Sequence, residues 1–160
     1  MKKVTSTILS LAVAICMLQQ SYIVEAAGNE FLDVPAEVII KQENTEGVNE
    51  IETKEASLGS CDLGISITSE GVGISFTTRA TGNANEIGVK NIVLQEKQLW
   101  GWKNIEISNR CTYNTNMYTG SVIYLNSVEG KTYKVHCTHY AIINGKEYTL
   151  YNESSEIVFN

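Results

Sequence analysis

The chain has 160 residues and a formal net charge of −6, with 43% hydrophobic and 19% charged residues. This hydrophobic share suffices for one small folded domain and excludes a wholly disordered chain. The acidic balance argues against nucleic-acid binding, which needs a clustered basic surface to displace counterions from phosphates.

Residues 1–26 predict a cleavable secretory signal peptide. Lys2 and Lys3 precede an apolar run at 8–18 that has signal-peptide length and is too short to span a bilayer. Val24-Glu25-Ala26 places small or branched residues where a signal peptidase binds, so we expect cleavage after Ala26. No second run of spanning length follows, and we expect a secreted chain, either released or associated with the cell envelope, with no transmembrane segment.

Cys16 lies near the end of this run, where a bacterial lipoprotein carries its acylated cysteine. That pattern requires a small residue directly before the cysteine, whereas Ile15 is bulky. We therefore expect Cys16 to be removed with the signal, and acylation is the alternative.

Residues 27–60 predict an acidic and largely disordered linker. They hold eight carboxylates against Lys41 and Lys54, whereas residues 61–160 hold nine acids against eight bases. The apolar residues of the linker are scattered without a period, which is typical of an extended, solvated spacer. Within it, 31–40 is either a docking strand or the remnant of a propeptide.

Residues 61–160 have the composition of a sheet protein, rich in Ile, Val, Thr and Tyr and broken by Gly and Asn. Period-two alternation predicts strands that bury one face each. The predicted strands cover 63–67, 72–76, 87–95, 102–107, 121–128, 131–143 and 148–159, the last interrupted near 152–155. We expect one all-β domain, a seven-stranded antiparallel β-sandwich.

Three local patterns refine these strands. A polar loop is expected at 80–85. The apolar residues of 87–95 change parity between Val89 and Ile92, which indicates either a strand buried on both faces or a β-bulge near Lys90-Asn91. Asn144-Gly145 lies between two β-rich runs and predicts a type I′ hairpin turn.

The segment 128–135 resembles the turn and tyrosine at the start of the sixth strand in the fibronectin type III and immunoglobulin-like sandwich. That resemblance implies that the Tyr133 hydroxyl ties the corner to the backbone. The domain is also similar to small exported proteins of Gram-positive bacteria that carry one domain of unknown function, a resemblance that implies no activity. The residues behind it are Ala80-Thr81, Ile87-Gly88-Val89, Leu94-Gln95, Trp100 or Trp102, Tyr133, His139 and Gly145-Lys146-Glu147.

Cys61, Cys111 and Cys137 are an odd set in an exported chain, so at most one disulfide forms within it. Cys137 shares strand parity with Tyr133 and Val135, and Cys111 follows a strand of the same predicted sheet. We expect a Cys111–Cys137 disulfide, with three free buried thiols as the alternative.

His136-Cys137-Thr138-His139 contains residue types that bind zinc or form a thiol nucleophile. Strand alternation sends His136 to one face and Cys137 with His139 to the other, so the two histidines do not converge on one ion. The domain carries no paired carboxylates, and Gly71-Val72-Gly73 lacks the third glycine and helix of a phosphate site. We expect no metal, no cofactor and no catalytic residue.

Trp100 and Trp102, with Tyr113 and Tyr118 from an expected loop at 111–120, form the candidate binding surface. Aromatic side chains stack on sugar rings and anchor protein partners. The leading hypothesis is a non-enzymatic module that binds an extracellular protein or glycan, unless these rings fill the core. The alternatives are a small secreted hydrolase or thiol enzyme using Cys137, His139 and Cys111, and a structural envelope protein without a discrete ligand.

Overall fold

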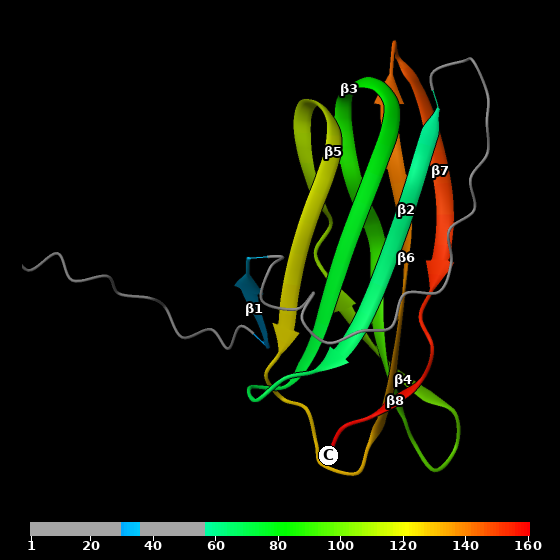
Figure 1. Ribbon diagram of the computed structural model, residues 1–160. Coiled ribbons are helices and arrows are strands. Elements are labelled where there is room, and N and C mark those ends of the chain that lie inside the picture. Colours follow the sequence, from blue (N-terminus) through cyan, green and yellow to red (C-terminus); the bar gives the residue numbers. More distant parts are fainter. Residues whose placement is uncertain (1–29, 36–56) are drawn as a thin grey trace, which may run out of the picture.

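A computed structural model describes residues 30–35 and 57–160 (Figure 1). The predicted signal peptide, its cleavage after Ala26, Cys16 and most of the linker lie outside the described residues. Every regular element in the described part is a β-strand, and the strands form one antiparallel sheet. They are β1 (Phe31–Val34), β2 (Leu58–Ile67), β3 (Val72–Lys97), β4 (Trp102–Ile107), β5 (Arg110–Tyr124), β6 (Thr132–Ile143), β7 (Lys146–Glu153) and β8 (Ile157–Val158).

The long strand β3 is the spine of the sheet. Its first part pairs with β2 and with the end of β5, and its second part pairs with β4, β6 and the start of β5. The β3–β5 register shifts between Arg79 and Ala84, where β3 turns over at one end of the molecule (Figure 1). The sheet therefore folds onto itself, an arrangement of two facing layers that is consistent with a β-sandwich.

The hydrophobic core lies between these layers. Val72, Ile74 and Phe76 alternate along the first part of β3 and are fully or almost fully buried. They meet residues of the returning part of β3 and of β4, β5 and β6. Alternation works here because successive strand residues point to opposite faces, so the large apolar side chains of one parity enter the core and small or polar residues of the other parity lie on the outer face.

The β-bulge near Lys90-Asn91 and the hairpin turn at Asn144-Gly145, two features predicted from short stretches of sequence, are present in the structure. Asn91 has a positive φ of 51°, and the β3–β6 register shifts between Lys90 and Val93. This bulge explains the change of parity, because one extra residue moves Ile92 back to the buried face. Asn144 and Gly145 have φ values of 52° and 78°, as a type I′ turn requires between β6 and β7.

Four expectations about the strands and the linker need correction. The sheet has eight strands rather than the expected seven. β1 is added beside β5, the seventh expected strand is divided into β7 and β8, and the expected strands at 72–76 and 87–95 are one strand, β3. The expected loop at 111–120 is part of β5, and the expected loop at 80–85 lies within β3. Within the segment 31–40, expected to be a docking strand or a propeptide remnant, Phe31–Val34 forms β1, and residues 36–40 lie outside the described residues. β2 begins at Leu58, inside the expected linker.

Candidate functional site

The tip of the β3–β4 hairpin, residues 98–101, carries the two most exposed large hydrophobic side chains of the described residues. Leu99 is 88% exposed and Trp100 is 90% exposed. The backbone N–H of Gln98 donates to the Gly101 carbonyl at 2.9 Å, and Gly101 has a φ of 85°. A residue with a side chain rarely adopts this left-handed conformation, so glycine permits a tight turn that holds both apolar side chains outward.

Trp102 has a different role at the base of this hairpin. It pairs with Lys97 across the two strands, and it is half-buried. The ammonium groups of Lys97 and Lys134 lie 5.5 and 4.9 Å from the centre of its ring. Such cation–π contacts stabilise a ring in place. Trp102 therefore supports the hairpin, and Trp100 is the tryptophan that it presents.

Buried Glu96 connects the hairpin to the rest of the domain. Its carboxylate accepts hydrogen bonds from the Gln98 side-chain amide at 2.6 Å and from the Tyr133 hydroxyl at 3.4 Å. The Lys131 ammonium lies 3.8 Å from the same carboxylate. The Tyr133 hydroxyl also accepts the Val128 N–H at 3.0 Å. The tip is thus fixed to the β5–β6 connection by hydrogen bonds to a charged group, which are stronger than neutral ones.

Tyr113 and Tyr118 do not join this surface. Tyr113 pairs with Glu86 near the bend of β3, whereas Trp102 pairs with Lys97 at the other end of that strand. The stretch of β3 between Glu86 and Lys97 is about 35 Å long at roughly 3.3 Å per residue. Tyr113 is 62% exposed, but half-buried Tyr118 packs against the core. The expected single aromatic surface is therefore divided between the two ends of the molecule.

The expected Cys111–Cys137 disulfide is wrong. Cys61, Cys111 and Cys137 are free thiols in the structure. Cys111 and Cys137 do belong to neighbouring parts of one layer, but Cys111 is exposed and Cys137 is completely buried. Side chains on opposite faces of a sheet cannot reach the geometry of a disulfide. Cys61 and Cys137 match the alternative of free buried thiols, and Cys111 does not.

Cys137 and His139 both point into the core, as strand alternation predicts. Their Sγ and Nε2 atoms lie 3.5 Å apart, and His139 Nδ1 lies 2.7 Å from the Thr78 hydroxyl, which donates to the Gly88 carbonyl at 3.2 Å. One arrangement of protons satisfies all three contacts. His139 Nδ1–H donates to the Thr78 hydroxyl, the Thr78 hydroxyl donates to the Gly88 carbonyl, and His139 Nε2 accepts the thiol proton of Cys137.

This buried pair has the wrong electrostatics for thiol catalysis. Burial raises the pKa of Cys137 to about 12 and lowers the pKa of His139 to about 4. Both groups are therefore neutral, whereas a catalytic cysteine is a thiolate at working pH. Both side chains are also completely buried. The pair stabilises the core and lacks the access to substrate that an enzyme needs.

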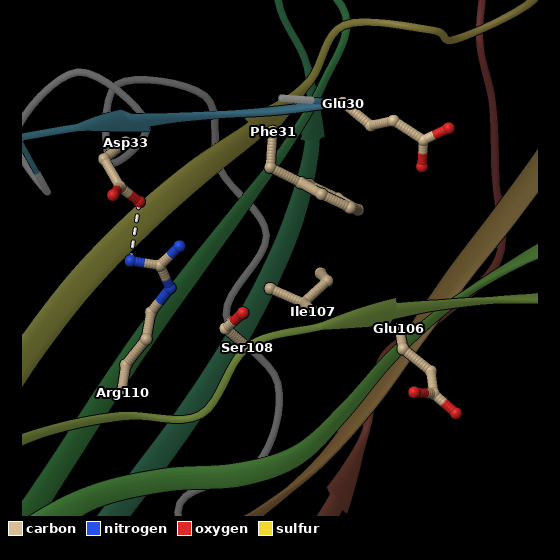
Figure 2. Close-up of a pocket in the computed structure, with 7 residues that line it drawn as sticks. All are labelled: Glu30, Phe31, Asp33, Glu106, Ile107, Ser108 and Arg110. Atoms are coloured by element: carbon tan, nitrogen blue, oxygen red, sulfur yellow. Dashed lines mark ion pairs between the residues drawn. The ribbon is translucent and has the colours of Figure 1, made fainter. Parts of the chain in front are cut away.

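A shallow hollow of about 370 Å³ lies between β1 and the β4–β5 junction (Figure 2). Phe31 and Ile107 lie between Arg110 on one side and Glu30 and Glu106 on the other. Arg110 makes an ion pair with Asp33 at 2.6 Å, which ties β1 to β5. No group of acidic, cysteine or histidine residues in the described part is arranged to hold a metal ion. The hollow contains none of the predicted site residues.

Sequence reasoning missed Leu99 and Glu96. A signal for Leu99 was present, because it directly precedes Trp100 in a turn, where an apolar side chain has no neighbouring strand to pack on. Glu96 gave no such signal, since its burial depends on Tyr133 and Lys131, which are distant in sequence.

Comparisons with protein families and with curated proteins give no relative on which to base an assignment. No protein-family model matches the chain, and no curated protein matches it. Among residues 30–35 and 57–160, no helix is long and apolar enough to cross a membrane.

Proposed function

We propose that this chain is an exported, non-enzymatic binding module that attaches to its extracellular partner through the tip of the β3–β4 hairpin. The domain is proposed to be an immunoglobulin-like or fibronectin type III-like sandwich. The hydrogen bond from the Val128 N–H to the Tyr133 hydroxyl supports that architecture, because a tyrosine ties the same corner in those folds.

The observation that carries the proposal is the exposure of Leu99 and Trp100. Single exposed apolar residues are common on soluble proteins, but two large neighbours that are both almost fully exposed are unusual. Tryptophan is also enriched among the residues that dominate binding energy. Both side chains project from a turn whose base is fixed by Glu96, so little ordering is required on binding.

The test compares the retention of the exported chain on intact cells or isolated cell envelopes. We expect Trp100→Ala to lower retention at least tenfold, because it removes the largest exposed apolar side chain. Tyr113→Ala is the matched control, since it removes an exposed aromatic ring at the opposite end of the domain. Equal retention of the wild type and Trp100→Ala would show that the hairpin tip is not the attachment surface, whatever the chemistry of the partner.

A further inference from the structure

The shape and chemistry of the hairpin tip restrict the class of partner that it can bind. We infer that Leu99 and Trp100 insert into the interfacial layer of a lipid bilayer. This inference rests on the proposed function, because it assumes that the tip is the contact surface. It specifies that the occupant is a fluid lipid interface rather than a protein or a glycan.

The tip is a hairpin turn that projects beyond the strands of the sheet (Figure 1). The hollow described in Figure 2 lies between β1 and the β4–β5 junction and is lined by neither Leu99 nor Trp100. A convex pair of apolar side chains needs a medium that adapts to its shape. Lipid chains adapt in this way, whereas a protein partner must supply a matching socket.

The backbone of the tip is suited to the edge of a bilayer. The Gln98 N–H is bonded to the Gly101 carbonyl, which closes the turn. The backbone groups of Leu99 and Trp100 need water, so the turn itself stays at the hydrated headgroup level and only the side chains go deeper. Tryptophan prefers the boundary between lipid headgroups and chains, because its ring is apolar and its indole N–H remains hydrated there. Leu99, beside it, is the side chain that enters the chain region.

The charges near the tip are largely neutralised by each other. Lys97 pairs with Glu156 at 3.3 Å, and Lys131 lies 3.8 Å from Glu96. Lys134 pairs with Glu153 at 2.6 Å, and among the lysines near the tip Lys103 alone makes no ion pair within the described residues. Attraction to anionic headgroups therefore contributes less than apolar burial. Val128 and Val158, which are about half-exposed, lie at the same end and add apolar surface behind the tip.

A glycan fits the tip less well. Sugar recognition combines a stacking ring with nearby hydrogen-bonding groups that fix the hydroxyls. The neighbours of Trp100 in the turn are Leu99 and Gly101, which offer no polar side chain. The side-chain amide of Gln98, two residues before Trp100 in the chain, is held by its hydrogen bond to Glu96.

The test measures partition of the exported chain onto vesicles of phosphatidylcholine by the fluorescence of Trp100, in a Trp102→Phe background. We expect a blue shift of the emission, quenching by lipids brominated near the headgroup end of their chains, and little change between low and high salt. Leu99→Ser should weaken partition at least tenfold, whereas Tyr113→Ala should leave it unchanged. Thermal unfolding of each variant verifies that the domain is folded.

Three results would overturn the inference, and they separate it from the proposed function. First, the folded protein does not partition onto vesicles, but its retention on envelopes still requires Trp100. The partner is then a protein or a glycan, and the proposed function stands. Partition that requires anionic lipid and is lost in salt is electrostatic attachment and contradicts apolar insertion. If Trp100 affects neither vesicles nor envelopes, both proposals fail.

Discussion

His139 shows how a single residue can be polar, titratable and structural at once. It is completely buried, and its two ring nitrogens contact the Thr78 hydroxyl and the Cys137 thiol. Burying a polar group without partners destabilises a fold, whereas a fully bonded group does so much less. His139 lies in a sequence that resembles a zinc or thiol site, but its observed contacts are those of a core residue.

The buried histidine makes stability depend on pH. The folded pKa of about 4 is below the unfolded value of 6.5, so the unfolded chain binds more protons between these values. The stabilisation is fully present above pH 6.5 and is lost as the pH falls toward 4. The loss is about 3 kcal/mol in the free energy of unfolding, since one pKa unit corresponds to about 1.4 kcal/mol.

Urea denaturation between pH 4 and pH 7.5 measures this slope. His139→Gln should be less stable at neutral pH and should lose most of the pH dependence in this window. His136→Gln is the matched control, because His136 lies on the outer face of β6 against Tyr151, and it should keep the wild-type slope. Identical slopes for the wild type and His139→Gln would show that His139 does not carry the effect.

At the scale of the strands, the sequence predicts those parts in which one face is buried. Alternation located β4 and the hairpin of β2 and β3, and the Asn144-Gly145 turn and the bulge at Asn91 followed from local backbone chemistry. The start of β5 was missed because its Thr, Asn and Tyr residues are mostly exposed and carry no alternating pattern. With that strand read as a loop, the face of Cys111 could not be assigned, and the disulfide prediction failed.

The pairing of β3 with β5 depends on a close approach at Gly88. Gly88 pairs with both Cys111 and Tyr140, and an added Cβ would lie 2.0 Å from the Arg110 carbonyl oxygen. Because that atom belongs to the backbone, it cannot move aside without breaking the strand pairing. We expect Gly88→Ala to lower the free energy of unfolding by about 2–4 kcal/mol.

Gly59→Ala is the matched control for that substitution. An added Cβ there has its nearest neighbour at 3.5 Å, an ordinary contact, and we expect a change within about 1 kcal/mol. Thermal or urea unfolding of both variants measures the difference. Equal stability of the two variants would mean that β3 and β5 are not held as closely at Gly88 as described.

For the whole molecule, the two ends of the folded sheet have different characters. One end holds the bends of β3 and β5 and the β6–β7 turn, with Tyr113 beside them, and the other holds the apolar hairpin tip (Figure 1). The sequence located Trp100 as a candidate, but it could not separate Trp100 from Trp102 or place the tyrosines. Those distinctions depend on Glu96, Lys134 and the path of β3, which only the folded chain brings together.

If the chain meets its partner through the hairpin tip, site-specific photo-crosslinking at the tip will capture that partner. A photoreactive amino acid replaces Leu99 in one variant and Tyr113 in another, and each exported chain is irradiated on intact cell envelopes. We expect covalent adducts from position 99 and none from position 113. Adducts from position 113 alone, or equal adducts from both positions, would contradict attachment through the tip.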